Sequence, residues 1–79
     1  MKTSHSNKPL NRKNAAFIRV AEKRTNRVID SIRLIGQCSN RRTYDYTDEQ
    51  VEKIFKEIRS ALRQAEQRFE ESRKTGFKL

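Results

Sequence analysis

The sequence predicts an all-α protein, an antiparallel hairpin of two long helices preceded by a basic N-terminal arm. Two stretches of the chain repeat apolar residues every three or four positions, as helices with one buried face do. Between them, residues 36–46 combine glycine, polar residues and two tyrosines, which suits an ordered connecting loop. Two helices joined in this way pack antiparallel, apolar face against apolar face.

The small size of the chain limits how this hairpin can be stabilised. The chain has 79 residues, 33% hydrophobic and 37% charged, so we expect one domain at most. A core of this size rarely contributes more than about 3–5 kcal/mol of net stability. Two apolar arcs of about 120° are wider than one helix-to-helix seam. We therefore expect Ile18, Ile29 or Leu34 to be left uncovered, and a dimeric four-helix bundle to cover them.

Residues 1–13 form the predicted arm. They are polar and basic and include the only proline, with Leu10 as the one large apolar residue after Met1. Such a segment buries too little apolar surface to fold alone, so a flexible arm is expected. It has no apolar stretch like that of a secretion signal, and no run in the chain reaches the ~18–20 apolar residues that span a bilayer. The expected location is the cytoplasm, with no membrane partner.

The first helix is predicted over residues 14–35, with Asn14 as its N-cap. At about 100° per residue, the residues of its buried face fall within an arc of about 120°. They are Phe17, Ile18, Ala21, Thr25, Val28, Ile29, Ile32 and Ile35. Gly36 follows, where a glycine in the left-handed conformation often ends a helix.

The second helix is predicted over residues 47–74, followed by a short tail at 75–79. Thr47 and Gln50 have the spacing of a capping box, and Tyr46 can pack against Val51 as a hydrophobic staple. The buried face consists of Val51, Ile54, Phe55, Ile58, Leu62, Ala65 and Phe69. The outer face is expected to form ion pairs four residues apart, at Glu49–Lys53, Glu52–Lys56 and Glu70–Lys74.

The net charge of +9 lies entirely in the first half of the chain. Residues 1–44 hold 11 Lys or Arg and 2 acids, whereas residues 45–79 hold 8 of each. Arg19, Lys23 and Arg27 recur every four residues opposite the buried arc, at a spacing of ~6 Å. This asymmetry points to a polyanionic partner, although a solvated helix face is an equally simple explanation. The predicted phosphate contacts are Arg12, Lys13, Arg19, Lys23, Arg24, Arg27, Arg33, Arg41 and Arg42, and Asp30 interrupts them.

The connecting loop is a second candidate for recognition. It combines arginines, amide and hydroxyl groups with two aromatic rings, a mixture found in protein-binding hot spots and in base-stacking sites. The partner-binding candidates are Asn40, Arg42, Tyr44 and Tyr46. The structural alternative is that the tyrosines cap the hairpin core and Asn40 occupies a left-handed turn position.

The sequence contains no pattern typical of catalysis or metal binding. No nucleophile is accompanied by a base, two glycines cannot form a phosphate-binding loop, and His5 and Cys38 provide no metal-ligand spacing. A helix-turn-helix needs a much shorter loop, a ribbon-helix-helix needs a preceding strand, and a leucine zipper needs a long heptad repeat. We therefore expect no enzyme, no cofactor and no metal.

The segment from Lys23 to Phe55, centred on LIGQCSN and YDYT, resembles an uncharacterised family of short proteins encoded in bacterial genomes and mobile elements. The resemblance covers somewhat under half of the chain. It implies a bacterial or phage cytosolic protein, and no activity or functional residue comes with it.

Three functions agree with these observations. The first is a non-enzymatic nucleic-acid-binding accessory protein that contacts DNA or RNA phosphates through the first helix, arm and loop. The second is a protein-binding adaptor, or an inhibitor of a larger bacterial enzyme or nuclease, whose residues 37–46 and exposed apolar edge meet an acidic protein surface. The third is a structural subunit of a ribonucleoprotein or other assembly. A homodimer or a larger complex is expected in each case.

Overall fold

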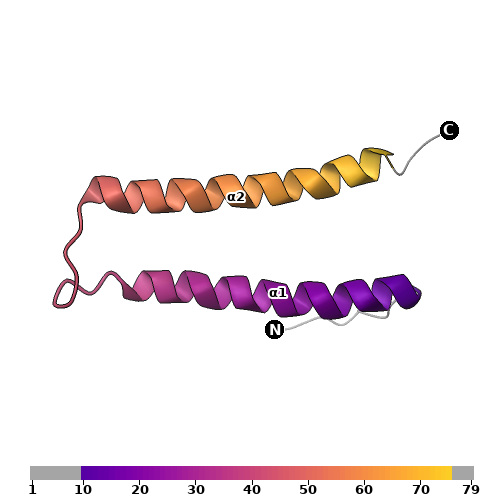
Figure 1. Ribbon diagram of the computed structural model, residues 1–79, viewed down its shortest axis with the longest axis horizontal. Coiled ribbons are helices and arrows are strands. Elements are labelled where there is room, and N and C mark those ends of the chain that lie inside the picture. Colours follow the sequence, from indigo (N-terminus) through magenta and orange to yellow (C-terminus); the bar gives the residue numbers. More distant parts are fainter. Residues whose placement is uncertain (1–9, 76–79) are drawn as a thin grey trace. The chain divides into compact units, whose positions relative to one another are not determined.

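The computed structural model describes residues 10–75, and these form two helices and no strand. Helix α1 spans Arg12–Gln37 and helix α2 spans Asp48–Thr75, each drawn as a continuous ribbon in Figure 1. The chain divides into two units, Met1–Tyr44 and Asp45–Leu79, with one helix in each. The all-α prediction is confirmed for the described residues, whereas most of the predicted arm and tail lies outside them.

Helix α1 begins two residues earlier than the sequence indicated. Asn11 is the N-cap: its backbone is extended, and its Oδ1 accepts a hydrogen bond of 2.8 Å from the Asn14 N–H. Asn14, the predicted cap, lies within the first turn, where its Oδ1 accepts a hydrogen bond of 2.9 Å from the Leu10 N–H. Arg12 and Lys13, predicted to belong to the flexible arm, are therefore helical.

Helix α1 also continues past Gly36, which the sequence indicated as its end. Gly36 and Gln37 are both helical, and the C-cap residue Cys38 has a right-handed backbone with φ −71° and ψ −5°. The Cys38 N–H donates to the Ile35 carbonyl at 2.9 Å, and the Ser39 N–H donates to the Gly36 carbonyl at 3.1 Å. No residue in the described range has a positive φ. The predicted glycine stop was wrong, because a tight turn takes up these carbonyls instead.

The start of helix α2 agrees with the sequence. The Thr47 N–H donates to Gln50 Oε1 at 2.9 Å, and the Gln50 N–H donates to Thr47 Oγ1 at 3.1 Å. Tyr46 and Val51 are half-buried, as expected of a hydrophobic staple. The capping box is confirmed, and it fixes the point where the helix begins.

The charged face of α2 pairs differently from the pattern expected. Glu70 forms an ion pair with Arg73, three residues on, where Lys74 was predicted to be its partner. Among the described side chains, no ion pair joins Glu49 to Lys53 or Glu52 to Lys56. Exposed pairs of this kind contribute only about 0–1 kcal/mol, so the helix depends little on which of them form.

Both helices expose their apolar residues. No side chain among the described residues is buried, and Phe17 and Val28 of α1 are 51% and 56% exposed. In α2, Leu62 and Phe69 are 58% and 64% exposed. Helical stability in proteins comes mainly from packing of the apolar face. Each helix therefore presents a surface that another element has to cover.

Candidate nucleic-acid interface

Helix α1 carries most of its basic residues on the side opposite its apolar arc, with Val20 and Leu34 lying among them. At about 100° per residue, Arg19, Lys23 and Arg27 fall within about 80° of one another, and Val28 and Ile32 lie on the opposite side. Because α1 begins at Arg12, the helix also carries Arg12 and Lys13, which extend the basic surface toward the N-terminal end of the helix. The basic face of α1 consists of Arg12, Lys13, Arg19, Lys23, Arg24, Arg27 and Arg33. It extends for roughly 30 Å along the helix axis.

One acid lies within the basic face and engages one of its members. Asp30 Oδ1 lies 3.5 Å from Arg33 Nη1, and the two side chains are 71% and 74% exposed. Arg19, Lys23 and Arg27 form no ion pair with any other described residue. The structure therefore distinguishes among the predicted contacts: Arg33 is partly neutralised, whereas the row of three keeps its charge available to an anion.

Asn40 organises the loop that follows α1. Its Oδ1 accepts a hydrogen bond of 3.0 Å from the Arg42 N–H. Its carbonyl accepts further bonds from the Thr43 and Tyr44 N–H groups, at 3.1 and 3.0 Å. The result is a single helical turn capped by Asn40, whose backbone is not left-handed as the structural alternative required. Arg41 and Arg42 lie within this turn, so the turn fixes where two more positive charges emerge.

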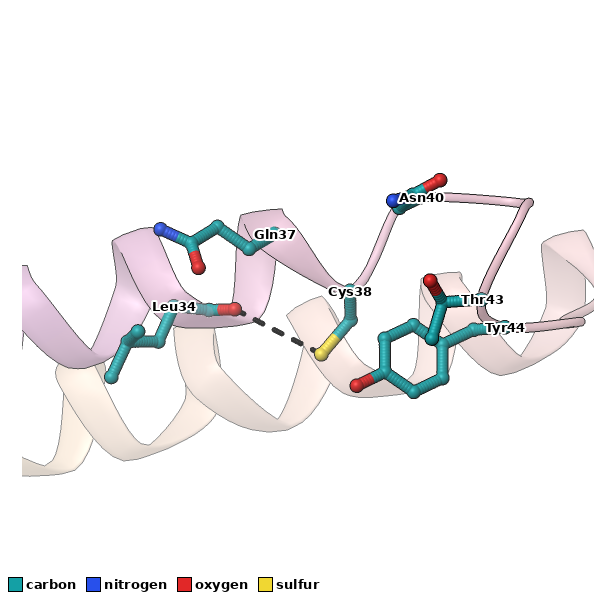
Figure 2. Close-up of a pocket in the computed structure, with 6 residues that line it drawn as sticks. All are labelled: Leu34, Gln37, Cys38, Asn40, Thr43 and Tyr44. Atoms are coloured by element: carbon teal, nitrogen blue, oxygen red, sulfur yellow. Dashed lines mark hydrogen bonds between the residues drawn. The ribbon is translucent and has the colours of Figure 1, made fainter.

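A shallow pocket lies where α1 meets this turn. Its lining residues are Leu34, Gln37, Cys38, Asn40, Thr43 and Tyr44, shown in Figure 2. The thiol of Cys38 is directed back to α1, with Sγ 3.8 Å from the Leu34 carbonyl oxygen. Tyr44 is 51% exposed, and its ring lies on the same side of the turn as the Cys38 sulfur (Figure 2).

The structure gives the two tyrosines of the loop different positions. Tyr44 lines the pocket in the first unit, whereas Tyr46 lies in the second unit, half-buried before the first turn of α2. The sequence grouped them as partner-binding candidates, and it did not single out Gln37, Cys38 or Thr43. Their proximity to Tyr44 depends on the backbone turn at Asn40, which residue spacing alone does not reveal.

Two properties of the described residues bear on other kinds of site. No three His, Cys, Asp or Glu side chains within residues 10–75 lie close enough together to hold a metal ion. Neither α1 nor α2 combines the length and the apolar character that a bilayer-spanning helix needs.

No family model, curated protein or solved structure matches this chain. The comparisons give no support to the expected resemblance of residues 23–55 to short bacterial and mobile-element proteins. What the interface can do follows from its own chemistry. Guanidinium groups bind phosphate oxygens in two-pronged hydrogen bonds, and ammonium groups bind them as point charges.

Proposed function

We propose that this protein is a non-enzymatic nucleic-acid-binding accessory protein that contacts phosphates through the basic face of α1 and the turn carrying Arg41 and Arg42. The observation that carries the proposal is the row of Arg19, Lys23 and Arg27 along one side of α1, opposite the apolar arc and without acidic partners. A row of cations at ~6 Å spacing along one side of a helix can contact several of the regularly repeated charges of a phosphate backbone.

The contrast between the two helices supports a dedicated surface over a merely solvated one. Residues 45–79 hold equal numbers of acids and bases, which is usual for a helix face exposed to water. Residues 1–44 hold 11 bases against 2 acids, and one of those acids already engages Arg33. Like charges placed this close repel one another, so the arrangement gains most when a polyanion is bound.

The exposed apolar faces support an assembly in which the helices pack through them. In this proposal α1 and α2 form an antiparallel hairpin, and a second copy covers what remains, giving a four-helix bundle. Side chains such as Phe17 and Leu62, both more than half exposed, would form its core. The dimer would then display two basic faces on its outer surface.

Fluorescence anisotropy with labelled duplex DNA, single-stranded DNA and structured RNA tests the proposal. If about six phosphates are neutralised, the affinity should fall on the order of a thousandfold between 50 and 200 mM salt. The triple variant Arg19→Glu, Lys23→Glu, Arg27→Glu should lose binding and keep its helicity by circular dichroism. The matched control is Lys56→Glu, Arg59→Glu, Arg63→Glu in α2, which changes the net charge equally and should retain most of the affinity.

Three results would overturn this assignment: no binding to any polymer at 50 mM salt, full binding by the α1 triple variant, or an equal loss in both triple variants. The first would exclude the nucleic-acid function, and the second would exclude the surface. The third would mean that overall charge, and not the basic face, determines the binding.

A protein-binding adaptor or inhibitor is the second candidate function, and the pocket beside Tyr44 favours it. Leu34 and Tyr44 are 60% and 51% exposed, and aromatic and aliphatic anchors of this kind dominate many protein interfaces. Binding of that type would persist in high salt and would be lost on Tyr44→Ala or Arg42→Ala. Salt dependence in the anisotropy experiment therefore separates the two candidates.

A further inference from the structure

The pocket at the end of α1 lies in line with the basic face. Around the helix axis, Leu34 falls between Lys23 and Arg27, within about 20° of each. It is thus on the opposite side from the apolar arc that includes Ile32. Leu34 is 60% exposed and lines the pocket together with Tyr44. An anionic chain laid along the basic face would reach this apolar position as it passed the end of the helix.

The chemistry of the pocket differs from that of the charged row leading to it. Tyr44 contributes an exposed aromatic ring and Leu34 an aliphatic side chain. Gln37, Asn40 and Thr43 are polar residues of the same lining, and Asn40 Oδ1 already accepts the Arg42 N–H. A flat group with a polar edge, such as a nucleobase, matches this combination of a stacking surface and hydrogen-bonding groups.

We infer that this pocket receives one unpaired base of the bound nucleic acid, stacked on the ring of Tyr44. The inference rests on the proposed function and adds the substrate class: a single strand, or a structured RNA with an unpaired segment. A base within a duplex has both faces covered by its neighbours and cannot stack on the protein without leaving the helix. Arg41 and Arg42 belong to the same turn as Tyr44 and would supply positive charge for the phosphates beside that base.

The loop is organised before any ligand binds. The hydrogen bonds accepted by Asn40 fix the backbone N–H groups of Arg42, Thr43 and Tyr44. A binding loop that is already ordered loses less conformational entropy on association. Tyr44 also needs no unfavourable backbone conformation, since no described residue has a positive φ.

The first arm of the experiment compares an unstructured single strand with a duplex of the same sequence by anisotropy at 50 mM salt. Tyr44→Ala should weaken single-strand binding about 5- to 150-fold, the range that loss of one stacked base produces. Tyr44→Phe should bind the single strand like the unchanged protein, because the ring is kept. Duplex affinity should be the same for all three proteins, which provides the control within the experiment.

The second arm uses the thiol in the pocket of the unchanged protein. Cys38 is the only cysteine of the chain and is exposed, so its alkylation rate reports directly on the pocket. A saturating single strand should slow alkylation of Cys38 several-fold, and a saturating duplex should slow it much less, because the bases of a duplex stay stacked on one another and cannot enter the pocket. This arm remains informative if Tyr44→Ala disturbs the turn, because it requires no substitution.

The outcomes separate this inference from the function on which it rests. Salt-dependent binding that does not distinguish Tyr44→Ala from the unchanged protein, or an unprotected Cys38 in the single-strand complex, would overturn the pocket and leave the basic face standing. Equal protection of Cys38 by the single strand and the duplex would overturn the inference that the pocket selects an unpaired base. Absence of binding to every polymer would overturn both the nucleic-acid-binding function and the base-binding pocket. Protection of Cys38 by a protein ligand that persists in high salt would instead assign the pocket to protein binding.

Discussion

Arg33 donates a hydrogen bond of 3.5 Å to Asp30 across one turn of α1, in line with the row formed by Arg19, Lys23 and Arg27. Both side chains of the pair are exposed to solvent, so the ion pair contributes little to the stability of the helix. Its importance is electrostatic. Asp30 is the one negative charge on this side of the helix and lies where phosphates would bind. Its ion pair with Arg33 also engages the arginine nearest the end of the helix.

Asp30→Asn is therefore expected to strengthen nucleic-acid binding. The substitution removes a repulsive charge and leaves Arg33 able to contact one more phosphate. The affinity at 50 mM salt should rise several-fold, and the slope of log affinity against log salt should steepen by about 1. Anisotropy titrations over a range of salt concentrations measure both quantities. Glu66→Gln in α2 is the control with the same change of charge, and an equal gain in that variant would contradict the role assigned to Asp30.

Gly36→Ala is expected to stabilise the protein by about 0.5–1 kcal/mol, because alanine loses less conformational entropy in a helix than glycine does. Gly36 lies within α1, and a Cβ added there meets nothing within 4 Å. Urea unfolding followed by circular dichroism gives the free energy of unfolding for both proteins. A destabilisation of similar size would show that residue 36 has the left-handed backbone originally expected from the sequence.

Thr47→Ala is expected to destabilise the start of α2 by about 0.5–2 kcal/mol, because the Gln50 N–H loses its acceptor in the capping box. Thr47→Ser keeps the hydroxyl and should lose much less. Hydrogen exchange at the Gln50 and Val51 amides measures the local effect and should accelerate in the alanine variant alone. Equal exchange rates in the two variants would mean that the hydroxyl does not cap the helix.

Ile32→Asp tests the proposed packing of the apolar faces. A charge at the centre of this arc would be buried without a partner in the four-helix bundle, at a cost of several kcal/mol. Sedimentation velocity should show monomers, and circular dichroism should show reduced helicity. Asn26→Asp introduces the same charge on the other side of α1 and should leave association unchanged. An unaltered dimer in the Ile32→Asp variant would exclude this arc from the interface.

Local chemistry explains why part of the fold was predictable from the sequence. The capping box of Thr47 and Gln50 involves four consecutive residues, so its residue types nearly determine its geometry. In the segment NRKN, asparagine occurs at both ends, and Asn14 at the second end was predicted as the cap of α1. The structure starts the helix at the first, where Asn11 accepts the hydrogen bond of Asn14. At the other end, Gly36 alone did not stop a helix that Gln37 could extend.

The candidate site was also predictable only in part: the basic row followed from the sequence, and the pocket did not. The orientation of Arg19, Lys23 and Arg27 followed from helical geometry alone, and the structure keeps all three in one helix. The pocket was not predictable, because it depends on the path of the backbone after α1. That path is set by the hydrogen bonds of Asn40, and the sequence indicated only that asparagine favours turns.

The absence of positive φ angles between residues 10 and 75 has an evolutionary consequence. No described position requires glycine for its backbone, so backbone strain places no limit on substitution and the limits that remain are the helix caps and the apolar arcs. What selection on a phosphate-binding function would preserve is the distribution of charge around α1, which can be kept while lysine and arginine exchange places along the helix.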